Sequence, residues 1–318
     1  MRNIFIVNPK AGQGRGNESF TKKLRQAAAH GGHEIEIYTT AGVGDAEVLT
    51  AQLAEERENG EKLRIYACGG DGTLNEVLNG VLRSEAGNVS IGVIPIGTGN
   101  DFCRNFPEAS DFMDIEAQLN AEEHRCDAIC YSGRIDGIQQ TRYCCNMLNV
   151  GFDCNVVDMT ARMKTYPMIS GSMAYLLSVF AIFAKKEGAD LRIEADGQTV
   201  HDGPLLLTAS ANGSFYGGGV KGAPTARIDD GFMDINVVRD IKRHKFLKLF
   251  PHYARGTHLE VEGIDSILYT AQIKKLAITP NSGSMRLCAD GEITDAERIE
   301  AETLPGAFDF LVPKKQGE

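Results

Sequence analysis

Three glycine-rich loops, each following an apolar run, carry the residues best suited to chemistry in this chain. Their sequences are NPKAGQG (8–14), GGDGTLNE (69–76) and PIGTGND (95–101). Glycine allows backbone N–H groups to surround a phosphate, and a helix expected to begin at Thr73 would add the positive end of its dipole. One such loop is equally well explained as a turn, but three in one half of the chain favour a nucleotide site.

The loops match neither of the two common nucleotide-binding patterns. The chain contains no GxxxxGKS or GxxxxGKT sequence, which excludes a Walker A loop. No GxGxxG sequence opens the first helix with an acidic residue about 20 positions further on, so the dinucleotide fingerprint is absent as well.

A carboxylate inside the second loop indicates a bound cation. Asp71 is flanked by glycines in GGDGT, and a carboxylate close to the phosphates of ATP repels them unless a cation intervenes. Mg²⁺ suits this role because it binds carboxylates, water and substrate phosphates together. The alternative is a turn aspartate that only stabilises its own loop.

A second pair of carboxylates lies late in the chain. Asp290 and Glu292 belong to the sequence ADGE (289–292), and a carboxylate within reach of a hydroxyl can accept its proton. On a continuous strand the two side chains would face the same way, but a turn at Gly291 would alter this. Asp-Gly is also a common hairpin turn, and the residues by themselves favour that simpler explanation.

Strands and helices alternate in the first hundred residues and position the three loops. The pattern predicts strands at 3–8, 33–40, 64–70 and 90–97, and helices at 17–30, 45–58 and 73–83. Asn17 is expected to cap the first of these helices. The alternation predicts a parallel sheet with helices on both faces, a Rossmann-like α/β domain over residues 1–130 whose sites lie where strands end.

After about residue 130 the pattern changes to short strands separated by turn sequences. Strands are predicted at 142–152, 190–195, 204–211, 232–238, 274–280 and 284–290, with helices at about 168–185 and 241–254. This predicts a mostly antiparallel β-sandwich domain over residues 131–303. The last segment, about 304–318, is expected to return to the first domain.

Composition narrows the classes of function. The 318 residues are 42% hydrophobic and 24% charged, as in globular proteins with sizeable cores, and the net charge of −10 argues against nucleic acid as a partner.

The start, MRNIFIVNPK, has no signal-peptide pattern, so a cytoplasmic chain with reduced thiols is expected. Cysteine and histidine spacings do not predict a zinc site. The uncharged stretch 165–184 favours a buried or interfacial helix over a membrane span, because polar residues and Pro167 interrupt its start.

The motifs together resemble the diacylglycerol kinase catalytic family. That family includes the bacterial lipid kinases and sphingosine kinase relatives, and more distantly resembles NAD kinases and 6-phosphofructokinases. The resemblance covers essentially the whole chain and is carried by NP (8–9), GGDGT (69–73), GTGND (97–101), GFD (151–153), AP…ARIDDGFMD (223–234) and ADGE (289–292). It implies an α/β domain of the NAD kinase/diacylglycerol kinase type followed by a β sandwich, with ATP as phosphate donor and Mg²⁺ as cofactor.

The resemblance also assigns the residues expected to bind the nucleotide. They follow the predicted strands, and they are Asn8, Pro9, Lys10, Ala11, Gly12, Thr40, Gly69, Gly70, Asp71, Gly72, Thr73, Leu74, Asn75 and Thr98. Thr40 is equally well explained as a strand-end residue.

Two metal sites are implied in the same way. Asp71, Asp101 and Asp127, with Arg104, resemble a network around the Mg²⁺ that accompanies ATP, although each can instead be a helix cap or an ion pair. A second, structural Mg²⁺ site would take the backbone carbonyls of Arg227 and Phe232 and the carboxylate of Asp230, because oxygen ligands suit a hard cation. The alternative is that DDG is only a turn.

The family assigns the proton acceptor to the ADGE sequence. Glu292 is therefore predicted to take the proton of the acceptor hydroxyl, with Asp290 as its companion; with Asp71 they form the predicted catalytic set.

The resemblance implies an ATP-dependent lipid kinase that phosphorylates diacylglycerol to phosphatidic acid. The alternatives are another lipid alcohol (phosphatidylglycerol, a sphingoid base or an undecaprenol-like alcohol), an NAD kinase, or a non-catalytic nucleotide-binding regulator. The partners expected are ATP and a lipid alcohol at a membrane surface, with peripheral association; a homodimer is left open. The basic and aromatic stretch 240–255 fits either a membrane surface or a solvated face, and 168–185 fits either an acyl cleft or a core.

Overall fold

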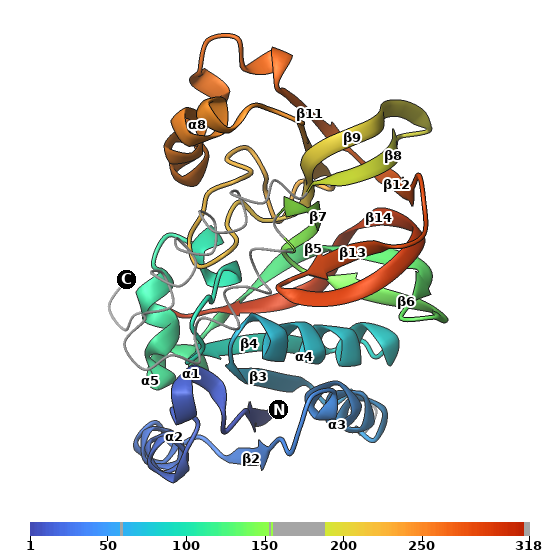
Figure 1. Cartoon of the computed structure of the whole chain (residues 1–318). Coiled ribbons are helices and arrows are strands. Elements are labelled where there is room, and N and C mark those ends of the chain that lie inside the picture. The colour runs from blue at the N-terminus through green and yellow to red at the C-terminus, as the bar shows by residue number, and fades with distance from the viewer. Residues whose placement is uncertain (58–59, 153, 155–187, 315–318) are drawn as a thin grey trace. The chain divides into compact units, whose positions relative to one another are not determined.

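The computed structural model describes residues 1–57, 60–152, 154 and 188–314 (Figure 1). The chain forms two compact units, Met1–Asp127 with Gly306–Glu318, and Ala128–Pro305. Two strands, β5 (Glu122–Ile135) and β14 (Glu292–Val312), contain the points where the chain passes from one unit to the other.

The first unit is organised around parallel strand pairs. The strands β1 (Arg2–Val7), β2 (Ile35–Thr39), β3 (Leu63–Gly69) and β4 (Val89–Pro95) pair in the order β2-β1-β3-β4, all in parallel. The last part of β14 also lies parallel to β4, with Asp309 opposite Ser90. The central strand β1 is buried on both faces from Ile4 to Val7, which is typical of a strand covered by helices on each side.

Helices connect these strands. They are α1 (Ala11–Gly14), α2 (Glu18–His30), α3 (Asp45–Glu55), α4 (Asp71–Arg83) and α5 (Ile115–Leu119), with short 3₁₀ turns η1 (Phe102–Asn105) and η2 (Ala109–Met113). Asn17 caps α2 as predicted, since its side chain accepts the N–H groups of Ser19 and Phe20. That cap is a local interaction, which explains why the sequence alone located it.

The two faces of the parallel strands pack on different helices. Phe5 and Tyr66 stack with ring centroids 4.5 Å apart and share a buried cluster with Leu24 of α2 and Leu119 of α5. Alternate strand residues such as Ile65 point to the opposite face, where α4 contacts β3 and β4 and α3 packs against α4 (Figure 1).

The second unit is built from antiparallel strands. Its further strands are β6 (Ile138–Cys144), β7 (Met147–Gly151), β8 (Ala189–Ala195), β9 (Gln198–Ala211), β10 (Met233–Arg239), β11 (Leu268–Ile273), β12 (Lys275–Pro280) and β13 (Met285–Ala289). The series β11-β10-β9-β7-β13-β14 is antiparallel throughout, as are the series β9-β8-β12-β14 and the pair β5-β6.

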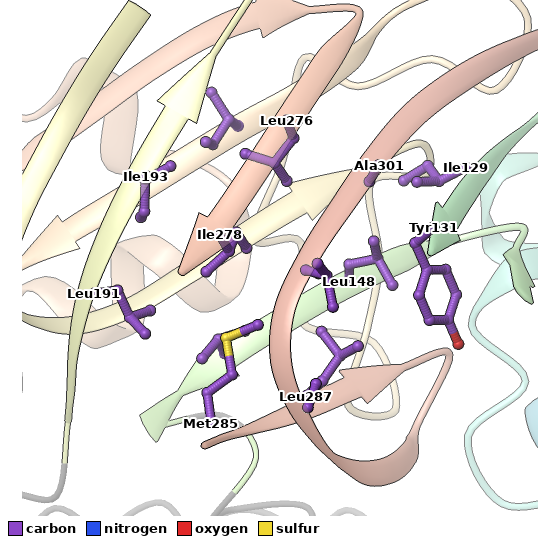
Figure 2. Close-up of a cluster of buried hydrophobic side chains, with 14 of the residues drawn as sticks. Ile129, Tyr131, Leu148, Leu191, Ile193, Leu276, Ile278, Met285, Leu287 and Ala301 are labelled. Atoms are coloured by element: carbon purple, nitrogen blue, oxygen red, sulfur yellow. The ribbon is translucent and has the colours of Figure 1, made fainter. Parts of the chain in front are cut away.

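A cluster of buried aliphatic side chains fills the space between two layers of this unit. Figure 2 shows Leu148 and Leu287 from β7 and β13 near Ile193 and Ile278 from β8 and β12, and all four are almost completely buried. The arrangement is the core of a β sandwich. The helix α8 (Arg243–Arg255), followed by η3 (His258–Glu260) and η4 (Ile264–Ser266), packs over a second apolar cluster that includes Leu206 and Val238.

Several expected elements need correction. The single strand predicted at 142–152 is two strands, β6 and β7, interrupted at Cys145 and Asn146, because the backbone there bonds to a side chain instead of a neighbouring strand. Strands β5, β11 and β14 were not predicted. The expected helix at 168–185 lies outside the described residues, and so does Asp153 of the GFD motif. Within the described part of the chain, no helix is both long and apolar enough to cross a membrane.

A glycine in α4 makes the close contact of α3 with α4 testable. A Cβ atom added at Gly80 would lie 2.6 Å from the backbone oxygen of Glu47 and 2.6 Å from Cβ of Thr50. We therefore expect Gly80→Ala to lower the free energy of unfolding by about 1–3 kcal/mol despite the better helix propensity of alanine. Gly87→Ala is the matched control because a Cβ there meets no atom within 4 Å. Equal urea midpoints for the two variants would contradict the contact.

Candidate active site

The predicted nucleotide-binding residues of the first unit lie where its parallel strands end. Asn8 follows β1, Thr40 follows β2, Gly70 follows β3 and Ile96 follows β4. The backbone N–H of Thr40 donates to the carbonyl of Val7 over 3.0 Å, which joins the ends of two strands. The carboxyl ends of parallel strands are the usual place for a ligand in such sheets.

Helix α4 begins at Asp71, two residues before the predicted start at Thr73. Gly70 is its N-cap, with extended backbone (φ −105°, ψ −166°) and no side chain to bond the first N–H groups of the helix. Asp71 therefore lies in the first turn, where a negative charge is favourable. The GGDGT sequence is a helix N-terminus, the end that attracts phosphate.

The carboxylate of Asp71 connects the second glycine-rich loop to the third. Its Oδ2 accepts the N–H of Asn100 and its Oδ1 accepts the N–H of Asp101, both over 2.7 Å. The backbones also meet directly, since the N–H of Gly97 donates to the carbonyl of Gly69 over 2.9 Å and a Cβ on Gly97 would lie 2.3 Å from Cα of Gly70. Asp71 thus positions a loop, a role that the sequence did not predict.

The third loop is closed by an asparagine in the left-handed region. Asn100 has φ +57° and donates from its side chain to the carbonyls of Pro95 (3.0 Å) and Gly97 (3.1 Å). Asn tolerates this backbone conformation because its short amide bonds locally. Thr98, a predicted nucleotide contact, is exposed at the tip of this loop.

The first loop joins the same group. Asn8 donates from Nδ2 to Oγ1 of Thr73 over 3.3 Å, and its Oδ1 accepts the N–H of Lys10 over 3.0 Å. Gly12 has φ +56°, and a Cβ there would lie 2.1 Å from the carbonyl oxygen of Ile96. The three glycine-rich loops predicted from the sequence are therefore in mutual contact.

Three of the predicted residues support the loops from behind or beside them. Ala11, Leu74 and Asn75 are buried, and the carbonyl of Asn75 accepts a hydrogen bond from the side chain of Asn79 over 2.8 Å. Two further residues of the predicted nucleotide-binding set, Pro9 in the first loop and Gly72 in the second, are partly exposed.

Glu76 is a supporting residue that the sequence analysis missed. Its Oε2 accepts the N–H of Ala46 over 3.1 Å, at the start of α3. The N-cap of that helix, Gly44, has no side chain to do this. Glu76 belongs to the GGDGTLNE loop and helix, but no spacing rule links it to residue 46.

The other two carboxylates of the predicted metal network have structural partners in this unit. Asp101 is buried and pairs with Arg104, Nε to Oδ1, over 3.2 Å. Asp127 is buried on β5 and accepts the N–H of Gly306 over 2.6 Å, at the start of the returning segment. The Arg104 contact corresponds to the ion-pair alternative, whereas the contact of Asp127 is with an amide of a strand and is neither a helix cap nor an ion pair. A metal role for either residue stays a prediction.

In the second unit, ADGE forms a tight hairpin turn between β13 and β14. Asp290 and Gly291 both have positive φ, +49° and +91°, and Ala289 pairs with Glu292. Two central residues with positive φ make a type I′ turn, for which Asp-Gly is well suited. The turn separates the two carboxylates: Asp290 is buried and Glu292 is exposed.

The buried carboxylate of Asp290 organises the break between β6 and β7. Oδ1 accepts the N–H groups of Asn146 (2.9 Å) and Met147 (3.0 Å), and Oδ2 accepts that of Cys145 (2.9 Å). The thiol of Cys144 also donates to Oδ1 over 2.9 Å; burial and the adjacent carboxylate raise its pKa, so it stays protonated. Asp290 therefore anchors the hairpin from which Glu292 emerges.

The predicted second metal site is a loop with carboxylates in the second unit. Asp230 accepts the N–H of Phe232 (3.1 Å) and the side-chain amide of Gln272 (3.1 Å). Burial, together with the charge of Asp230, raises the pKa of nearby Asp234. Arg227 bonds to Asp229 at 3.4 Å. Among the described residues no three His, Cys, Asp or Glu side chains are grouped around a metal position, but a site made of backbone carbonyls and one carboxylate does not need such a group.

The second unit also contains an apolar hollow beneath α8. Its enclosed part measures about 30 Å³, within about 460 Å³ of empty space that includes the opening to solvent. The lining consists of aliphatic and aromatic side chains with two tyrosines and one histidine, among them Leu207, Val238, Phe246, Tyr253 and His258.

His258 is the unusual member of that lining. It is fully buried, and neither ring nitrogen has a hydrogen-bond partner among the described residues. Its ring lies 4.7 Å from that of Tyr253, and burial lowers the pKa of His258 to about 4. The lining of the hollow therefore combines apolar side chains with a neutral imidazole and two tyrosines.

Comparison with known proteins identifies the family. Residues 2–131 match the diacylglycerol kinase catalytic domain, and residues 146–312 match the YegS C-terminal NAD kinase beta sandwich-like domain. A diacylglycerol kinase of Staphylococcus aureus (strain bovine RF122 / ET3-1) is 32% identical over 259 residues, covering 80% of this chain and 76% of that protein. The chain belongs to the diacylglycerol kinase family. Its members are lipid kinases, and this protein is an enzyme of that class.

Two further relatives extend the similarity over the whole chain. A diacylglycerol kinase of Bacillus subtilis (strain 168) is 28% identical over 321 residues, covering 99% of this chain and 97% of that protein. A crystal structure of a diacylglycerol kinase from Bacillus anthracis str. Sterne superimposes with a TM-score of 0.69 at 20% identity, covering 98% and 96% of the two chains. That structure supports the fold, including the C-terminal β sandwich. The family resemblance predicted from the motifs is confirmed.

Loss of the Asp290 carboxylate should destabilise the protein. Asp290→Ala leaves three buried backbone N–H groups without their acceptor, so we expect the free energy of unfolding to fall by about 3–5 kcal/mol. Glu292→Gln, two residues away but exposed, should change it by less than about 0.5 kcal/mol. Urea unfolding measures both, and a neutral Asp290→Ala variant would contradict the anchoring role.

Buried His258 should make stability depend on pH. The pKa of a histidine in the unfolded chain is about 6.5, and the pKa of His258 in the folded protein is about 4. Between these two pH values the unfolded chain therefore binds a proton at His258 that the folded protein does not bind. On going from about pH 7.5 to pH 5.5, this proton binding should lower the free energy of unfolding by about 1.4 kcal/mol. His258→Phe should reduce the pH dependence of urea unfolding by that amount, whereas exposed His244→Gln should not. Identical pH slopes in wild type and His258→Phe would contradict it.

Proposed function

We propose that the protein transfers the terminal phosphate of ATP to the free hydroxyl of diacylglycerol, producing phosphatidic acid and ADP. The observation that carries the choice of acceptor is the apolar hollow of the second unit. Its apolar lining matches the chemistry of an acyl chain and offers little to a dinucleotide, whose phosphates and ribose need polar partners; at about 30 Å³ the hollow would have to widen to admit a chain. The relatives named as diacylglycerol kinases support the same acceptor.

ATP is proposed to bind at the three connected loops of a Rossmann-like domain over residues 1–130. The uncapped N-terminus of α4 and the glycines around it offer backbone N–H groups to the phosphates, with Asn8 and Thr73 beside them. Asp71 holds the second and third loops in register. Bound together with ATP, Mg²⁺ would neutralise part of the phosphate charge.

Glu292 is proposed as the proton acceptor. It is exposed at the first position of β14, so its carboxylate is accessible to a substrate hydroxyl, and the Asp290 anchor fixes the turn that carries it. A carboxylate needs no unusual pKa for this role if it lies close to the hydroxyl. Asp230, with carbonyls of Arg227 and Phe232, would hold a structural Mg²⁺ in the β-sandwich domain proposed over residues 131–303.

The acceptor is a lipid, so the enzyme is proposed to associate peripherally with the cytoplasmic face of a membrane. Residues of about 304–318 are proposed to complete the nucleotide-binding domain, consistent with the pairing of Asp309 and Phe310 on β4.

A panel of acceptors tests the function. Purified protein is incubated with labelled ATP, Mg²⁺ and mixed micelles of diacylglycerol, phosphatidylglycerol, a sphingoid base or undecaprenol, with NAD in a parallel reaction. We expect the label on diacylglycerol. Label on a different lipid would show that this lipid, and not diacylglycerol, is the acceptor. Label on NAD alone would overturn the assignment as a lipid kinase.

The same assay tests the proton acceptor. Glu292→Gln should lower kcat by at least about 100-fold with little change in ATP affinity, because a general base contributes to the transition state and not to nucleotide binding. Glu297→Gln, an exposed glutamate further along β14, is the matched control. An equal loss of ATP binding in Glu292→Gln would remove its role as base.

A further inference from the structure

Helix α8 has two faces of opposite character. Phe246 and Tyr253 are buried, and Leu249 and Phe250 line the hollow with them. With 3.6 residues per turn, the opposite face and its border carry Lys245, Leu247, Lys248 and Arg255, and Lys242 lies just before the helix; all five are exposed. Figure 1 shows α8 to one side of β11 in its own unit.

The outer face of α8 is a local concentration of positive charge on an acidic protein. No Asp or Glu occurs from residue 241 to residue 259, although 43 of the 318 residues are acidic and the net charge is −10. Lys242, Lys245 and Lys248 are exposed, and none of them forms an ion pair among the described residues. Some exposed cations of the second unit are paired, as Arg298 is with Glu300 at 2.9 Å.

An apolar side chain lies among these charges. Leu247 is 49% exposed, one of six large hydrophobic residues with high exposure in the described chain. A helix with lysines and an exposed leucine on one face suits the boundary between anionic headgroups and acyl chains, where the charges meet phosphate and leucine enters the apolar layer.

We propose that the outer face of α8, formed by Lys242, Lys245, Leu247, Lys248 and Arg255, docks on an anionic lipid bilayer. The proposal rests on the proposed function, since a lipid kinase must reach its acceptor in a membrane. The inner face of the same helix covers the apolar hollow. Docking through α8 would therefore bring the lipid-binding hollow to the membrane surface and shorten the path of the acceptor.

Vesicle binding tests the proposal. The full chain is sedimented with vesicles of phosphatidylcholine and phosphatidylserine in equal parts, and with phosphatidylcholine alone. We expect binding to the anionic vesicles only, weakened by salt. Lys245→Gln with Lys248→Gln should reduce it about 25-fold, at about fivefold per lysine. The control is Lys22→Gln with Lys23→Gln, two exposed lysines of α2 without ion pairs among the described residues, which should bind like wild type.

Three results would overturn docking through α8. They are equal loss of binding in the α8 and α2 variants, no loss in the α8 variant, and a shift of the α8 variant from dimer to monomer in analytical ultracentrifugation, which would make the face a subunit interface.

Activity on a soluble short-chain diacylglycerol separates this proposal from the proposed function. The α8 variant should phosphorylate the soluble acceptor like wild type and lose activity only on vesicles. If wild type itself phosphorylates no acceptor, the proposed function fails, while the vesicle measurement still decides the role of α8.

Discussion

Both candidate sites depend on a carboxylate that accepts backbone N–H groups from a loop far away in the sequence. Asp71 holds Asn100 and Asp101, and Asp290 holds Cys145, Asn146 and Met147. Hydrogen bonds to an ionised acceptor are about twice as strong as neutral ones, and an amide left without its acceptor in a buried position is costly. Asp71 therefore fixes a glycine-rich loop that its own backbone would not hold, and Asp290 fixes the break between β6 and β7.

This arrangement separates the residue that builds a site from the residue that can react. In the hairpin of β13 and β14, the oxygens of Asp290 are occupied by three amides and a thiol, whereas Glu292 is exposed at the adjoining strand position. A reacting base must exchange protons with substrate, so it cannot also be the permanent acceptor of backbone amides. A rigid turn carrying an accessible carboxylate is a suitable support for phosphoryl transfer, which relies mainly on positioning.

The second unit adds the features that fit a lipid. Its hollow is apolar except for tyrosines and His258, and the helix over it has a basic outer face with Leu247 exposed. The hollow is lined by the second apolar cluster, which is separate from the aliphatic cluster between the two layers. A single helix thus separates an apolar hollow on one side from a cationic surface on the other.

The sequence by itself determined the features that depend on neighbouring residues. It located the Asn17 cap, most strands, helix α8 and the three glycine-rich loops, because caps, periodicity and turn chemistry act within a few residues. Only the tertiary structure decided that Asp71 joins two loops, that Asp290 divides the predicted strand 142–152, and that His258 is buried with no hydrogen-bond partner among the described residues. These outcomes depend on contacts between residues 29 to 146 positions apart, and a pattern read along the chain contains no information about which distant amide a carboxylate will meet.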